Sequence, residues 1–225
     1  MKQLISLLFL IVLLCLSACR DRSIPILDDT TCQEECFIFE GQVMDPNNDV
    51  PVQSLIKVEF KRHPYLSFRV VGELETDSLG QYRFALNGRD FLFPNGEFKL
   101  QAFKEGFLTN SYDGTLEFHH PDSSQFDIPF AADLLLRPSA NLQFTFKGEL
   151  EGISDFRYRY RYGSTGFVFR VLDEHLDVAQ VFEHEVAGDQ FIQLSFNYMK
   201  AGQKVEKTDS LFIAKGELGV YKLEW

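Results

Sequence analysis

Segments in which apolar and polar residues alternate one by one recur along most of the chain and strongly constrain its fold. Clear examples are Ile56, Val58 and Phe60 between charged residues, and Ile192, Leu194, Phe196 and Tyr198 between polar ones. Successive side chains of a strand point to opposite faces, so a period of two predicts half-buried strands. Turn-forming clusters between these segments predict antiparallel β-sandwiches. The 23 Phe against 3 Met also favour sheet cores over helical bundles. Helix is expected only as a single turn near residues 88–91.

The alternating pattern stops and restarts around Pro138. Residues 126–136 are expected to form the closing strand of a first unit, and Arg137, Pro138 and Ser139 a short polar junction. Proline has no backbone donor for a central strand. We therefore expect two sandwiches, over residues 37–137 and 138–225, with few contacts between them, so that each half folds when separated from the other.

The N-terminal residues have the features of an export signal. Lys2 precedes an apolar run over residues 4–16, which contains one polar residue, Ser6, and Ser17, Ala18 and Cys19 follow the run. The run is shorter than the roughly 20 residues that a membrane-spanning helix needs. A small-residue cleavage site ending in Cys resembles the bacterial lipoprotein signal, in which the sulfur of Cys19 is acylated. This resemblance implies a signal peptide over residues 1–18 and lipid anchoring to the bacterial cell envelope, most plausibly the outer membrane.

Residues 19–36 then form the lipidated N-terminus and a tether. This stretch carries Asp21, Pro25, Asp28 and Asp29 without apolar periodicity, so we expect it to be solvated and flexible. The formal net charge of the whole chain is −11, and removal of Lys2 with the signal makes it more negative. Such an acidic protein repels phosphate backbones, which argues against a nucleic-acid partner. The expected partners are the membrane, through the lipid, and an envelope protein or glycan.

Two cysteines remain once Cys15 has left with the signal and Cys19 carries lipid. In an oxidising exported compartment, Cys32 and Cys36 are expected to pair with each other. A helix would hold their Cβ atoms roughly 5–6 Å apart, farther than the roughly 3.8 Å that a disulfide prefers. The bond therefore requires a turn. Zinc binding is the weaker alternative, because no second Cys pair or nearby His pair supplies the other ligands.

An Arg–Tyr repeat over residues 157–162 is the most unusual local pattern. In a strand it places Arg157, Arg159 and Arg161 on one face and three tyrosines on the other. Guanidinium groups pair well with carboxylate and phosphate, so this stripe could dock an anionic partner or glycan. The alternative is a solvated face on which the arginines pair with Glu and Asp of adjacent strands while the tyrosines line the core. The sequence leaves both interpretations open.

No pattern typical of catalysis or of a cofactor site occurs in the chain. Nucleophile elbows, His-Glu-x-x-His and phosphate-binding glycine loops are absent. Histidines stand beside carboxylates in three places, His119-His120-Pro121-Asp122, Glu174-His175 and Glu183-His184-Glu185. Neighbours along a strand point to opposite faces, so we interpret these as exposed histidines rather than metal ligands. We expect no enzyme activity, no catalytic residue, no metal site and no cofactor.

Several short motifs in the first half occur in the order and spacing of a known family. They are Glu40-Gly41-Gln42-Val43-Met44-Asp45, Val50-Pro51-Val52, Leu74-Glu75-Thr76-Asp77, Gly80-Gln81-Tyr82-Arg83-Phe84 and Ala102-Phe103-Lys104-Glu105-Gly106-Phe107. Together they resemble the carboxypeptidase regulatory-like, or transthyretin-like, domain. That family implies a sandwich of seven or eight strands, used as a folding, docking or adhesion module and without catalytic residues. In physical terms, Gly41 would allow close strand approach, Gly80 would turn the chain, and Tyr82 and Phe84 would fill the core.

The second half resembles, more loosely, the small Ig-like sandwich of two-domain outer-membrane lipoproteins and fimbrial anchor subunits. The resemblances imply a non-enzymatic docking, adhesion or structural subunit of the cell envelope. A glycan-binding accessory lipoprotein of an outer-membrane uptake system is the alternative. The single Trp of the chain argues against it, because glycan sites commonly use exposed aromatic residues.

Overall fold

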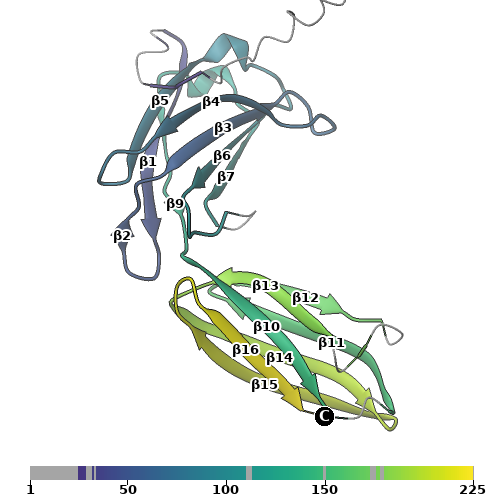
Figure 1. The fold of residues 1–225 in the computed structure, drawn as a ribbon. Coiled ribbons are helices and arrows are strands. Elements are labelled where there is room, and N and C mark those ends of the chain that lie inside the picture. Colours follow the sequence, from purple (N-terminus) through teal and green to yellow (C-terminus); the bar gives the residue numbers. More distant parts are fainter. Residues whose placement is uncertain are drawn as a thin grey trace, which may run out of the picture.

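The computed structural model describes residues 25–28, 32, 34–109, 113–148, 151–172, 176–177 and 180–224, and over these the chain is all-β. Strands β1 to β9 gather in one body and β10 to β16 in a second, as Figure 1 shows. Each body consists of two sheets packed face to face. The predicted fold class of two consecutive β-sandwiches is confirmed. In the described part of the chain, no helix is long and apolar enough to span a membrane.

The first body pairs one sheet in the order β4-β3-β6-β7 with a second built around β1. In the second sheet, β1 lies next to β2, β5, β8 and β9. The strands are β1 (Cys36–Asp45), β2 (Val50–Pro51), β3 (Leu55–Lys61), β4 (Arg69–Glu75), β5 (Gln81–Asn87), β6 (Glu97–Phe103), β7 (Thr115–His119), β8 (Pro129–Ala131) and β9 (Leu134–Leu135). Two short 3₁₀ turns, η1 (Gly88–Asp90) and η2 (Ser123–Gln125), complete it. The helical turn expected near residues 88–91 is η1.

The expected closing strand over residues 126–136 is divided into β8 and β9, and both run parallel to β1. Ala132 and Asp133 separate the two strands, and the carbonyl oxygen of Ala132 accepts a hydrogen bond from the Tyr82 hydroxyl at 2.6 Å. A Cβ atom on Gly41 would lie 1.8 Å from that same carbonyl oxygen. The expected close approach at Gly41 is therefore confirmed, and it is the backbone of Ala132 that needs the space. A single antiparallel closing strand was the wrong expectation.

The first core is dominated by phenylalanine. Phe39 lies at its centre and packs against the rings of Phe84, Phe98, Phe118 and Phe130, with ring centroids 5.0–5.4 Å apart. Such stacked and edge-to-face pairs add stability beyond their buried area. Tyr82 and Phe84 are buried as expected, and Gly80 has the positive φ of +69° that turns the chain before β5.

The second body pairs a four-stranded sheet, β12-β11-β14-β15, with a three-stranded sheet, β13-β10-β16. The strands are β10 (Ser139–Lys147), β11 (Ile153–Tyr162), β12 (Thr165–Arg170), β13 (Val181–Ala187), β14 (Gln190–Lys200), β15 (Gln203–Ile213) and β16 (Leu218–Glu224). The first and last strands of this body, β10 and β16, pair in parallel. Its core contains Phe144, Phe156 and Phe196 together with Tyr158, Tyr160 and Tyr162. Trp225 lies outside the described residues.

The two bodies meet through the connection between β6 and β7. Phe107 bridges to Pro138, and the backbone N–H of Leu108 donates to the carbonyl oxygen of Arg137 at 2.8 Å. Leu108 belongs in sequence to the first body, yet its side chain is 2% exposed and packs in the second core. Asp113 is fully buried, pairs with the guanidinium of Arg137 and accepts a hydrogen bond at 3.5 Å from the hydroxyl of Tyr162, which belongs to the second core. Contacts therefore cross the expected boundary at Pro138, which the local pattern of alternation could not indicate.

Residues 25–28 do not behave as the solvated tether that the sequence predicts. Backbone hydrogen bonds of 2.8 and 2.9 Å join Leu27 and Pro25 to Glu73 of β4. Leu27 is 4% exposed and lies over Gly72, where a Cβ atom would approach the leucine side chain to 2.4 Å. The glycine leaves room for Leu27, and burial of this leucine outweighs the polar character of the segment. Over these residues the prediction was wrong. Cys19 and the rest of residues 19–24 lie outside the described part.

Candidate functional site

The Arg–Tyr repeat forms the regular part of β11, and its two faces separate as the sequence predicts. Arg157, Arg159 and Arg161 are exposed on the outer face of the sheet β12-β11-β14-β15. The intervening tyrosines are buried in the second core. Because this alternation follows from strand geometry alone, the orientation of the three arginines could be predicted without knowing the neighbouring strands.

The strands next to β11 place almost no negative charge beside the arginines. On the β14 side, Arg157 lies opposite Asn197, Arg159 opposite Ser195 and Arg161 opposite Gln193. On the β12 side, the partners in register are Arg170, Val168 and Gly166. Among the described residues, neither Arg159 nor Arg161 has a carboxylate within ion-pair distance. The interpretation that Glu and Asp of adjacent strands neutralise the stripe therefore fails for these two arginines.

A β-bulge near the start of β11 supplies the only carboxylate recorded against these guanidinium groups in the described part. The register shifts between Ser154 and Arg157, and Asp155 has a φ of +51°. The extra residue allows Ile153 and Phe156, three positions apart, both to face the core. One carboxylate oxygen of Asp155 lies 3.2 Å from both Arg157 and Arg170. Two guanidinium groups thus share one carboxylate, which leaves excess positive charge at this end of the stripe.

A shallow depression of about 440 Å³ runs beside Arg157 and Arg159. Its walls include Val168, Asn197, Met199 and Lys204. Arg170 adds positive charge that the sequence did not assign to the site, because its place depends on the pairing of β12 with β11. Lys204 of β15 borders the same depression, but its ammonium group pairs with the carboxylate of Glu206. We call the outer surface formed by Arg157, Arg159, Arg161, Arg170, Gln193, Ser195, Asn197 and Lys204 the arginine face. It offers N–H donors, hydroxyls and amides, which suit oxyanion recognition.

The layer beneath the arginine face is aromatic and contains a histidine. The Tyr158 hydroxyl lies 2.7 Å from Nε2 of His184 on β13, and the rings of Phe169 and His184 are 4.6 Å apart. Burial lowers the pKa of His184 and raises the pKa of Tyr160 to about 12. Both residues are therefore neutral near pH 7, and this layer supports the arginines without adding charge.

The sheet β4-β3-β6-β7 of the first body carries the other notable group of charged side chains. Ligand atoms of Glu97, Glu117 and His119 lie within 4.8 Å of one another. Glu97 of β6 is paired with His119 of β7, and Glu117 lies two positions earlier on β7. Lys61 Nζ lies 2.8 Å from Glu97 Oε2, so an ammonium group already neutralises the most buried of the three. We interpret this group as part of an ion-pair network. The sequence grouped His119 with its neighbours His120 and Asp122, and it gave no sign that Glu97 and Glu117 lie beside this histidine.

The other histidines lie apart from such a cluster. The ring of His120 contacts the Pro94 carbonyl oxygen at 3.0 Å, and Asp122 caps η2. His184 points inward while Glu183 and Glu185 are exposed on the opposite face of β13. His175 and Glu174 lie outside the described residues.

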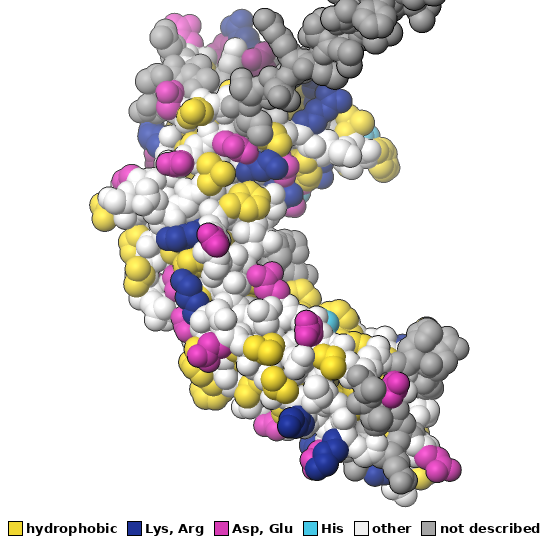
Figure 2. Space-filling model, in the orientation of Figure 1, with side chains coloured by type: hydrophobic (Ala, Val, Ile, Leu, Met, Phe, Trp, Pro, Cys, Tyr) yellow, Lys and Arg dark blue, Asp and Glu magenta, His cyan; other side chains and the backbone are white. Residues whose placement is uncertain are grey.

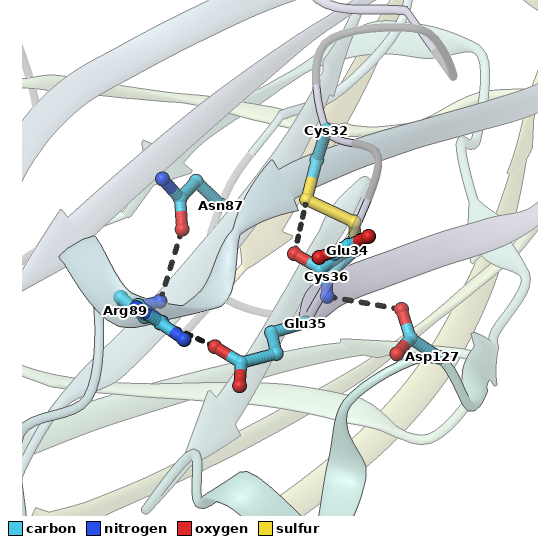
Figure 3. Close-up of a disulfide and its surroundings, with 7 residues drawn as sticks. All are labelled: Cys32, Glu34, Glu35, Cys36, Asn87, Arg89 and Asp127. Atoms are coloured by element: carbon cyan, nitrogen blue, oxygen red, sulfur yellow. Dashed lines mark hydrogen bonds and ion pairs between the residues drawn. A yellow bond between two sulfur atoms is a disulfide. The ribbon is translucent and has the colours of Figure 1, made fainter.

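Cys32 and Cys36 form a disulfide at the entrance to β1, with their Cα atoms 5.9 Å apart. Figure 3 shows the turn that makes this possible. Glu35 has a φ of +55°, so the segment is not helical, and its carboxylate pairs with Arg89. This ion pair lowers the pKa of Glu35. The backbone N–H of Cys36 donates to Asp127 Oδ1 at 3.1 Å. The bond thus closes a local loop that is also tied to η1 and to the segment before β8.

Comparison with known proteins gives only distant likenesses of fold. No family model matches the chain, and no curated protein matches it. The chain is similar to 3-chlorocatechol 1,2-dioxygenase from Rhodococcus opacus 1CP, with 12% identity and a TM-score of 0.32, over 52% of this chain and 68% of that one. It is also similar to the shaft pilin SpaA from Lactobacillus rhamnosus GG, with 9% identity and a TM-score of 0.33, over 85% and 98%. The major pilin SpaD from Corynebacterium diphtheriae is 10% identical, with a TM-score of 0.32, and the match covers 78% of this chain and 64% of that one. None of these likenesses carries an argument about function.

Proposed function

We propose that this protein is a non-enzymatic, lipid-anchored protein of the bacterial cell envelope that docks an anionic partner on its arginine face. The observation that carries the proposal is the absence of carboxylates opposite Arg159 and Arg161 in either neighbouring strand. The lipobox ending at Cys19 supports anchoring, which we propose to be in the outer membrane. The motif order in residues 37–137 supports a carboxypeptidase regulatory-like first sandwich, and the second sandwich is proposed to be Ig-like.

Local charge makes the arginine face suitable for such a partner even though the whole chain is acidic. Exposed charges farther apart than about 8 Å are largely screened at physiological ionic strength. A partner on this face therefore interacts mainly with Arg157, Arg159, Arg161 and Arg170, and less with the acidic remainder of the protein. Planar guanidinium groups bind carboxylates and phosphates through two parallel hydrogen bonds. The favoured partner is a protein segment rich in Asp and Glu.

A glycan that carries carboxylates is the second candidate partner. The row Gln193, Ser195 and Asn197 beside the arginines favours it, because amides and hydroxyls hydrogen-bond sugar hydroxyls while guanidinium groups bind the acidic substituents. This would make the protein an accessory lipoprotein of a glycan-uptake system. The two candidates are distinguished by measuring whether a soluble acidic polysaccharide or an acidic peptide competes better with partner capture.

The test replaces Arg157, Arg159 and Arg161 together with Gln and measures capture of partners from envelope extract at low and high salt. Exposed ion pairs contribute about 0.2–1 kcal/mol each, so capture at low salt should fall about tenfold. The salt dependence should fall with it. The matched control replaces the exposed Lys104, Lys147 and Lys222 with Gln, which changes the net charge equally but leaves the arginine face intact.

A melting curve of the triple arginine variant accompanies the capture experiment. An unchanged melting temperature with reduced capture supports docking. Capture equal to that of the lysine control would overturn the proposal, and a lowered melting temperature would assign the arginines to stability instead.

A further inference from the structure

One end of the first body exposes apolar side chains to an unusual degree. The loop between β3 and β4 exposes 92% of Tyr65 and 55% of Leu66. Ile26, which lies along β4, is 85% exposed. Figure 2 shows hydrophobic side chains beside Lys or Arg and a His on the part that projects at the upper right of the first body. Exposed apolar side chains that lie next to one another, unlike single ones, mark surfaces that contact a partner or a membrane.

The loop carrying Tyr65 and Leu66 is structured. The backbone N–H of Leu66 donates to the His63 carbonyl oxygen at 2.9 Å, and the rings of His63 and Tyr65 lie 5.1 Å apart. The guanidinium of Arg62 lies over the ring of Phe93, 4.8 Å from its centroid. These contacts present the apolar tip at a defined position, so a partner would not bear the full entropic cost of ordering it.

Positive charge surrounds this apolar tip. Lys61, Arg62 and Arg69 line a depression of about 420 Å³ together with Leu66 and Phe91. Asp90 is the acidic residue that borders the same depression. Lys61 is neutralised by Glu97, so Arg62 and Arg69 provide the available positive charge. An apolar tip with basic residues beside it matches the two components of an anionic lipid surface, the acyl region and the headgroups.

The chain also enters the first body towards this end. Ile26 pairs in parallel with Glu73 of β4, so from Leu27 back to Pro25 the chain runs along β4 in the direction of Arg69. Cys19 stands six positions before Pro25, and six extended residues span at most about 20 Å. A lipid on Cys19 would therefore hold this end of the body close to the bilayer.

We propose that the β3–β4 loop rests on the lipid bilayer, with Tyr65 and Leu66 in the interfacial region and Arg62 and Arg69 at anionic headgroups. The proposal rests on the lipid anchoring proposed above. In this orientation a tyrosine ring places its apolar body in the membrane and its hydroxyl at the headgroups. One lipid anchor and one loop contact would together fix how the first body stands on the membrane.

The main test measures quenching of a tryptophan by brominated lipids in the acylated full chain, reconstituted into vesicles of phosphatidylethanolamine and phosphatidylglycerol. Tyr65→Trp and Phe191→Trp are compared in a Trp225→Phe background, since Phe191 is equally a surface aromatic but lies in the second body. Mass spectrometry first establishes acylation of Cys19. We expect the Tyr65→Trp emission to shift to the blue and be quenched, and the Phe191→Trp emission to stay unchanged. An unquenched Tyr65→Trp chain that is acylated would overturn the loop contact while leaving the anchoring intact.

A second measurement uses the non-acylated Cys19→Ser chain and sedimentation with the same vesicles, so it does not depend on the anchor. Arg62→Gln and Arg69→Gln should each lower partitioning about fivefold, because a basic residue near an anionic surface contributes about 1 kcal/mol. Vesicles of phosphatidylcholine alone should bind less. Equal partitioning of the wild-type chain and both variants would refute the headgroup contacts. If Tyr65→Ser instead abolishes capture of an envelope protein while vesicle binding is unaffected, the tip is a protein contact and the proposal fails.

Discussion

The two four-stranded sheets of this protein have the same strand arrangement but differ in how the charges on their outer surfaces are paired. Their strand orders are β4-β3-β6-β7 and β12-β11-β14-β15. In each sheet the first two strands of the order form a hairpin, and the strand that comes later in the sequence, β4 or β12, lies at the edge of the sheet. On the first sheet, Lys99 Nζ lies 3.1 Å from Glu59 and Lys61 Nζ lies 2.8 Å from Glu97, so positive and negative charges alternate across the strands. On the second, Arg159 faces Ser195 and Val168.

This difference shows that composition alone does not identify a docking surface. The first sheet carries several lysines that form ion pairs with glutamates. Each of these ion pairs must be broken before its ammonium group can bind a partner. On the second sheet, Arg159 and Arg161 have uncharged neighbours in register, so among the described residues no ion pair has to be broken before these two arginines bind a partner. The useful criterion is therefore the identity of the residues opposite each charge, which strand pairing determines.

The largest expected effect tests whether the two sandwiches are separate bodies at all. Leu108→Ala removes a side chain that the first body contributes to the core of the second, and we expect unfolding to become easier by about 2–5 kcal/mol. Urea denaturation followed by Trp225 fluorescence measures it. Leu79→Ala, at an exposed turn of the first body, is the control and should change stability by less than about 0.5 kcal/mol. A Leu108→Ala chain as stable as this control would show that the second core does not use the residue.

An intermediate effect is expected in the ion-pair network of the first sheet. Glu97 is 8% exposed and contacts both Lys61 and His119, so Glu97→Gln should destabilise the chain by about 1–3 kcal/mol. Glu117→Gln, on the exposed neighbouring strand, and Arg159→Gln, on the arginine face, should each stay within about 0.5 kcal/mol. The denaturant midpoints of the three variants, compared with that of the wild-type chain, test these expected losses of stability. Equal losses for Glu97→Gln and Arg159→Gln would remove the contrast between the two sheets.

The smallest stability effect comes from making the second sheet resemble the first. Ser195→Glu places a carboxylate opposite Arg159, and such a cross-strand pair should stabilise the chain by at most about 1 kcal/mol. Partner capture should nevertheless fall, because the new carboxylate competes for the guanidinium. Ser195→Gln is the matched control without charge. Undiminished capture by Ser195→Glu, with normal capture by the control, would argue against Arg159 as a contact.

Features that depend on neighbouring residues in sequence were predictable, and those that depend on distant pairing were not. The period of two predicted the strands, the outward arginines and the buried tyrosines, because it is a local property of the backbone. Asp155, Arg170 and Lys204 join the arginine face only through a bulge and through pairing with β12 and β15. The alternation in each segment is compatible with many such pairings.

Two of the mistaken expectations have the same origin. Residues 25–28 look like a tether because their segment carries several Asp residues and no apolar periodicity, but the burial of a single leucine opposite Gly72 holds them against β4. The boundary at Pro138 looks free of contacts because Leu108 lies in a different segment of the sequence. In both places one apolar side chain is buried against a segment that is distant in sequence. Composition averaged over a segment does not reveal such a match.

The pairing of residues 25–27 with β4 also determines how the molecule responds to mechanical load. Tension applied to the N-terminal end of the chain reaches Pro25 and Leu27 before it reaches β1. Their hydrogen bonds to Glu73 lie across the direction of pull, so they resist in shear, and Leu27 must leave the core before they yield. The bond between Cys32 and Cys36 then passes the remaining force directly into the first residue of β1. Tension on the N-terminal end would therefore load the contacts of Leu27 with the first core before it loads the hydrogen bonds of β1.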